Sequence, residues 1–95
     1  MIPQKVTICG IPHSVTLCDD RFDLDTHFGQ IKYGKAEIII SKDVTPELQE
    51  QALFHEILHG ILTLLAFDEA NDEHFVQSVS NAMFQVFTLK QEDSP

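Results

Sequence analysis

The sequence predicts an α+β fold in which two N-terminal β-hairpins form a small antiparallel or mixed sheet packed on two C-terminal helices. Three observations lead to this prediction. The 95 residues allow a single domain, 1–95. Residues 1–41 are rich in alternating β-branched side chains, whereas apolar residues after position 45 recur at helical spacing. A run of strands followed by a run of helices is typical of α+β domains.

Two hairpins account for the β-rich half. Residues 4–9 and 14–18 alternate and flank a Gly-Ile-Pro segment, which predicts a hairpin. Residues 29–33 and 36–40 flank Gly34-Lys35, and a two-residue loop that begins with glycine is a type II′ hairpin signal. We therefore expect four strands in this half of the chain.

The first hairpin determines what the two cysteines can do. A turn at the Gly-Ile-Pro segment places Cys9 opposite His13 and Cys18 opposite Gln4. The two sulfurs are then too far apart for a disulfide or a shared metal ion. We expect two free thiols on buried strand residues, which suits a reducing cytoplasm.

Two helices account for the second half. Thr45-Pro46 is a typical helix start, with Thr as N-cap and Pro at the first position, and this helix is expected over 45–67. A second helix is expected over 71–89, capped by its first or second residue. The polar segments 19–27 and 90–95 are predicted to be a loop, with a short helical turn as an option, and a flexible tail.

Charge and hydropathy exclude two classes of partner. Six Lys+Arg against 15 Asp+Glu give a net charge of −9, which disfavours nucleic acid and anionic membrane surfaces. Segment 52–67 is too short and too polar to cross a bilayer. The first residues lack the pattern of a secretory signal, so a cytoplasmic location is expected.

His55, Glu56 and His59 form an H-E-x-x-H motif on the first predicted helix. Histidines four apart lie on one helix face and can bind one Zn²⁺. Glu56 lies about 100° round the helix from His55, where a carboxylate can contact a water on the metal. The surrounding helix is apolar nearly all round, which predicts burial. A metal site is favoured over a buried ion-pair network or an exposed polar stripe.

A catalytic zinc site needs a third protein ligand, because this helix supplies only two. Asp72, Glu73 and His74 are the candidates, at the start of the second predicted helix. Helix geometry slightly favours Asp72, although its side chain is short and can serve as the N-cap. Geometry alone leaves the three candidates open.

The sequence resembles the small phage- and prophage-encoded HExxH zinc metallopeptidase-like proteins of bacteria, which are minimal, gluzincin-like zincins. Four stretches carry the resemblance: 53–61, 73–87, 8–15 and 29–33. The resemblance implies a zincin-like fold and a bacterial host cell. It also implies Glu73 as the third zinc ligand, because an acid, two residues and a valine occur at 73–76.

The implied function is zinc-dependent hydrolysis of peptide bonds in a peptide or protein substrate, with a metal-activated water and Glu56 as general base. The alternative is a non-catalytic, zinc-stabilised phage accessory or interaction module.

The gluzincin motif Asn-Glu-x-x-Ser-Asp is absent. His27 and Tyr33 are candidate oxyanion stabilisers by chemistry only, and segment 36–40 is the expected edge strand for substrate.

Overall fold

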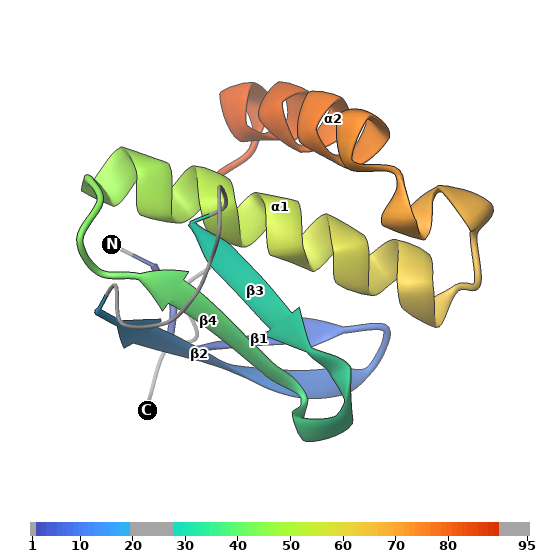
Figure 1. Ribbon diagram of the computed structural model, residues 1–95, viewed down its shortest axis with the longest axis horizontal. Coiled ribbons are helices and arrows are strands. Elements are labelled where there is room, and N and C mark those ends of the chain that lie inside the picture. The colour runs from blue at the N-terminus through green and yellow to red at the C-terminus, as the bar shows by residue number, and fades with distance from the viewer. Residues whose placement is uncertain (1, 20–27, 90–95) are drawn as a thin grey trace.

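The computed structural model describes residues 2–19 and 28–89. The predicted loop over 19–27, apart from Asp19, and the predicted tail over 90–95 lie outside the described residues. The four strands are β1 (Lys5–Ile8), β2 (Ile11–Cys18), β3 (Gly29–Lys32) and β4 (Glu37–Ser41). The two helices are α1 (Pro46–Leu64) and α2 (Glu73–Val86). The strands form one mixed sheet packed with the helices, which confirms the predicted α+β fold (Figure 1).

The sheet has the strand order β1-β2-β4-β3, so β4 is central and β3 lies at an edge. β4 runs parallel to β2 and antiparallel to β3. Ile38, Ile39 and Ile40 are all buried, and a continuous apolar run of this kind suits an interior strand. The expectation that 36–40 is an exposed edge is therefore wrong, and β3 takes that place.

The first hairpin turns at Cys9 and Gly10, whose φ values of 51° and 83° are those of a two-residue type I′ turn. The tighter turn shifts the register, so that His13 lies opposite Val6 instead of Cys9. Cys9 is exposed in the turn, contrary to the expectation of a buried strand residue, and Cys18 is half-buried. Within the described residues, neither cysteine forms a disulfide, as predicted.

The second hairpin has a longer connection than the predicted type II′ turn. Tyr33–Lys35 form a single 3-10 turn, and Ala36 follows with φ 48°. The backbone N–H of Ala36 donates to the carbonyl of Tyr33 at 3.1 Å. Because the last paired residues are Lys32 and Glu37, four residues connect the strands. Tyr33 consequently leaves the ladder and projects from the end of β3.

Helix α1 begins as predicted, with the Thr45 hydroxyl accepting a hydrogen bond from the Leu48 N–H at 3.2 Å and Pro46 in the first turn. It ends at Leu64, earlier than expected, and Ala66 beyond it adopts φ 61°. Among the described residues, no helix is both long and apolar enough to span a membrane.

Helix α1 is covered on two sides, which explains its apolar circumference. One side packs on the sheet, where Leu53 joins a core with Ile8, Ile38 and Ile40. The other side packs against α2, where Leu58 and Leu62 meet the buried Val76. Figure 1 shows α1 lying between the sheet and α2. The polar motif of α1 is therefore held between a strand edge and a helix start.

Candidate metal centre

Three side chains from two helices converge at one point. His55 and His59 lie one turn apart on α1, and Glu73 is the first residue of α2. The two Nε2 atoms are 3.1 Å apart. Glu73 Oε1 lies 3.1 Å from His55 Nε2, and Glu73 Oε2 lies 3.0 Å from His59 Nε2. Their ligand atoms all fall within 4.8 Å of one another, so these three residues can hold a metal ion.

The orientation of His59 is set by a backbone contact. Its Nδ1 lies 2.7 Å from the carbonyl oxygen of Ala70, in the 3-10 turn Asp68–Asn71 that precedes α2. A carbonyl only accepts, so Nδ1 carries the proton and donates. In the neutral ring this leaves a lone pair on Nε2. Histidines that bind metals are usually held in this way by a hydrogen bond from the second ring nitrogen.

The lone pair of His59 then faces groups that also carry lone pairs. Glu73 Oε2 is a carboxylate acceptor 3.0 Å away, and His59 and His55 are 8% and 6% exposed. The Glu73 carboxylate itself is about half exposed, but an acceptor held this close to the lone pair of a buried imidazole still needs a positive charge between them. A divalent cation supplies that charge, and a protonated imidazole is the alternative. The donor set of two imidazoles and one carboxylate therefore fits a metal ion.

The structure distinguishes the three candidates for the third ligand. Asp72 is the N-cap of α2, and its Oδ1 accepts a hydrogen bond from the Phe75 N–H at 3.0 Å. His74 is exposed and is not part of the cluster. The slight preference of helix geometry for Asp72 is therefore wrong, because α2 begins at Glu73 and ends at Val86, within the expected 71–89, and the Asp72 carboxylate caps its N-terminus. Glu73, the residue implied by the resemblance, completes the cluster.

Glu56 is buried beside the cluster and is only 5% exposed. Burial raises its pKa from 4.5 to about 8, and the nearby Glu73 carboxylate adds to this effect. Glu56 is absent from the group of converging ligand atoms. It lines a cavity of about 210 Å³ together with all three residues of the cluster. A carboxylate in this place can exchange a proton with a molecule bound at the centre.

Tyr33 lines the same cavity, on the side formed by the end of β3. Its phenol oxygen accepts a hydrogen bond from the Thr63 hydroxyl at 3.0 Å, and Thr63 lies one turn after His59 on α1. His27, the second candidate for stabilising an oxyanion, lies outside the described residues. Tyr33 is thus the candidate that the structure brings to the centre.

Gly29, at the start of β3, allows the strand to approach Glu56 closely. A Cβ atom at position 29 would lie 3.2 Å from Glu56 Cγ and 2.8 Å from Ile40 Cδ1. Gly29 is buried and lines the cavity that contains the cluster. Sequence reasoning missed this role, because a glycine at a strand end carries no signal for a distant glutamate.

We expect Gly29→Ala to destabilise the protein by about 1–3 kcal/mol, because the added methyl overpacks the site. Glu56 should be displaced while the metal ligands stay in place. Urea unfolding measures the stability, and elemental analysis measures the bound metal. Gly34→Ala is the matched control, since a Cβ there meets nothing within 4 Å. Equal effects of the two substitutions would contradict the close approach.

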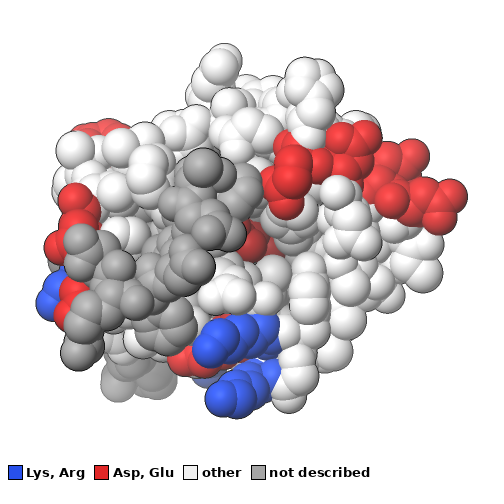
Figure 2. All heavy atoms as spheres, viewed as in Figure 1, with Lys and Arg blue, Asp and Glu red and all other residues white. Residues whose placement is uncertain are grey.

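The charge around the centre favours cations. Asp68, Glu69, Asp72 and Glu73 are exposed on the segment that leads into α2. Figure 2 shows acidic side chains gathered over this part of the molecule, and lysine or arginine side chains at the opposite edge near the β3–β4 turn. A cluster of negatively charged side chains raises the local concentration of cations.

Comparisons of the chain with protein-family models, curated proteins and solved structures find no match. The resemblance to minimal zincins therefore stays a prediction from the motif and its flanking residues. What supports a function is the arrangement of His55, His59 and Glu73 beside Glu56.

Proposed function

We propose that this protein is a zinc-dependent metallopeptidase. The observation that supports the proposal is the convergence of His55, His59 and Glu73 beside the buried carboxylate of Glu56. Two histidines and one glutamate are the ligands of one class of catalytic zinc site, which leaves a coordination position open. Imidazole ligands favour zinc and similar transition metals over Mg²⁺ and Ca²⁺.

Each residue has a distinct role in the proposed reaction. His55, His59 and Glu73 hold the metal, and the hydrogen bond from His59 to Ala70 keeps the ring in the binding orientation. Zinc in such a site supplies Lewis-acid activation of water and of a carbonyl group. Glu56 accepts the proton of the attacking water and then delivers it to the leaving amine.

In the proposed reaction, Tyr33 stabilises the negative charge that develops on the carbonyl oxygen. The Thr63 hydroxyl donates to the phenol oxygen, so the phenol's own proton is directed elsewhere. Tyr33 lines the cavity that holds the cluster, and a hydrogen-bond donor there stabilises a developing oxyanion. No charged side chain is needed for this role.

β3 offers an edge to which an extended substrate can pair. It is the outer strand of the sheet on the side of the cluster, and Gln30 and Ile31 line the same cavity. Peptides commonly bind proteins by adding a strand to such an edge. We therefore assign the substrate-binding edge to β3 in place of segment 36–40.

The test combines metal analysis with hydrolysis. The purified protein should contain about one zinc per chain and cleave a mixed peptide library, and mass spectrometry detects the products. Chelation should stop cleavage, and added zinc should restore it. Bound metal without cleavage of any peptide would overturn the peptidase and support the zinc-stabilised interaction module. Absence of bound metal after incubation with zinc would overturn both the peptidase and the zinc-stabilised interaction module.

A further inference from the structure

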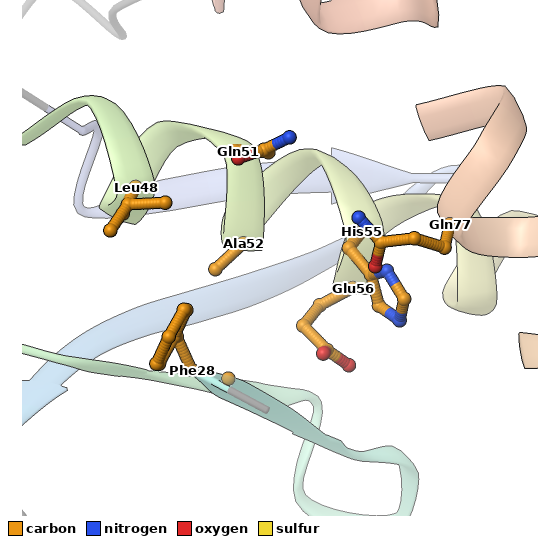
Figure 3. A pocket seen from close by; sticks show the side chains of 8 residues that line it. Phe28, Leu48, Gln51, Ala52, His55, Glu56 and Gln77 are labelled. Carbon is orange, nitrogen blue, oxygen red and sulfur yellow. The ribbon is translucent and has the colours of Figure 1, made fainter. Parts of the chain in front are cut away.

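A second cavity of about 250 Å³ lies along the N-terminal half of α1, next to the metal centre. It shares Gly29, His55 and Glu56 with the first cavity, so the two cavities adjoin at these residues. The remaining lining residues are Phe28, Leu48, Gln51, Ala52 and Gln77. Figure 3 shows these side chains extending from Leu48 and Phe28 at one end to His55 and Glu56 at the other.

The two ends of this cavity differ in chemistry. Phe28, Leu48 and Ala52 make the end distant from the metal centre apolar. At the near end, Gln77 reaches from α2 over His55 (Figure 3). A substrate residue can therefore place its side chain at the apolar end and its main chain beside Glu56.

Two glutamine side chains at this cavity are held by one asparagine. Asn81 Oδ1 accepts hydrogen bonds from Nε2 of Gln77 at 2.9 Å and from Nε2 of Gln51. Gln77 lies one turn after Glu73 on the same face of α2, so it stands directly beside the cluster. Within the part of the chain that the structure describes, the side-chain carbonyl oxygen of Gln77 has no hydrogen-bond partner. It is available to accept a hydrogen bond from a ligand.

We infer that this cavity takes one uncharged, apolar side chain of a peptide substrate. Gln77 positions the main chain of that residue, because its side-chain oxygen accepts a hydrogen bond from the backbone N–H. The inference rests on the proposed peptidase function and adds its substrate class. Gln77 acts as a substrate-binding and positioning residue, because it contacts the peptide beside the bond to be cleaved.

The size and charge of the cavity support this assignment. Its 250 Å³ is slightly below the range of about 300–1,000 Å³ usual for whole small-molecule ligands, so it suits a single side chain. A lysine would place its ammonium group beside Leu48 and Phe28, whose side chains offer no acceptor, at the end of the cavity distant from Glu56. A glutamate would be repelled by Glu56 and Glu73. Leucine, methionine or phenylalanine has neither cost.

The test measures peptide binding by the zinc-loaded Glu56→Gln variant, in which the peptides stay intact. Blocked peptides carry leucine, phenylalanine, lysine or glutamate at each position in turn, and Kd is obtained from NMR titration. At one position, the leucine or phenylalanine peptide should bind at least about tenfold more tightly than the lysine and glutamate peptides. Equal affinities at every position would overturn the inference.

Variants assign this preference to the cavity. Ala52→Phe in the same background should fill the apolar end and remove the preference, whereas Ala82→Phe, on an exposed position of α2, should leave it unchanged. Should Ala52→Phe fail to fold, Leu48→Ala enlarges the same end and should shift the preference from leucine to phenylalanine. A preference unchanged by a folded variant at either position would overturn the inference.

The role of Gln77 is tested with a modified peptide. N-methylation of the selected residue removes its N–H donor and should weaken binding to the protein with Gln77 about tenfold, the usual effect of losing one hydrogen bond. The same methylation should have no effect on the Gln77→Ala variant, because the acceptor is already gone. An equal effect in both proteins would overturn the assignment. Failure of the unmodified protein to cleave peptides, with selective binding intact, would count against the peptidase alone.

Discussion

Replacing His59 by alanine is expected to abolish metal binding and the stability that metal confers. His59 links the three parts of the centre, because its Nε2 faces both His55 and Glu73 and its Nδ1 holds the turn before α2 through Ala70. The substitution removes one of three ligands and leaves the Ala70 carbonyl without its donor. Metal at one hundred times its Kd stabilises a folded protein by about 2.7 kcal/mol. The variant should show none of this gain.

Thermal unfolding with and without zinc measures this prediction, and elemental analysis gives the bound metal. His74→Ala is the matched control, because His74 is exposed on the first turn of α2 and is not part of the cluster. The control should bind zinc and gain stability as the unmodified protein does. A His59→Ala protein that still gains stability from zinc would show that the ion binds elsewhere.

The local features of the fold were predictable from sequence. Thr45 and Pro46 mark the start of α1 through capping chemistry that depends on adjacent residues only. The order and direction in which the strands pair were harder to predict from sequence. That β4 pairs with β2 in parallel depends on burial of Ile38–Ile40 on both faces, which is a tertiary outcome. The type I′ turn was not predicted, because it requires a positive φ at Cys9, and cysteine rarely adopts this left-handed conformation.

The residues of the candidate site also fall into those predictable from local sequence and those that depend on the tertiary structure. His55, Glu56 and His59 follow from spacing on one helix, whereas Glu73 depends on where α2 begins and how it crosses α1. A shift of one residue in the helix start separates Glu73 from Asp72, and helix boundaries are the least certain part of a sequence prediction. The resemblance implies Glu73, and the structure brings this residue next to the two histidines; helical periodicity alone does not distinguish it from Asp72.

Glu56→Gln is expected to retain the metal and to lower peptide hydrolysis by about 10²–10⁴-fold, the usual contribution of a general base. The amide has nearly the same shape as the carboxylate but cannot accept the proton of water. None of the three converging ligands is altered. Glu47→Gln, on an exposed residue of the same helix, is the matched control and should keep full activity. Undiminished cleavage by Glu56→Gln would exclude Glu56 as the base.

The same variant changes how the metal-free protein responds to pH. Burial raises the pKa of Glu56 from 4.5 to about 8, so the folded state keeps a proton that the unfolded state has already lost in this interval. The contribution of Glu56 to stability is complete below pH 4.5, falls as the pH rises and is lost above about pH 8. The amide of the variant cannot ionise, so Glu56→Gln should be more stable than the unmodified protein at about pH 9, by a few kcal/mol at most.

Urea unfolding of both metal-free proteins from about pH 4 to about pH 9 measures this difference. The two proteins differ only at position 56, so subtracting one stability curve from the other gives the effect of replacing the Glu56 carboxyl by an amide. The difference should grow between pH 4.5 and about 8 and then level off. Bound zinc should reduce it, because a nearby dication favours the carboxylate and lowers its pKa toward the range in which Glu56 can act as a base. A flat difference across the whole pH range would mean that Glu56 is solvated in the folded protein.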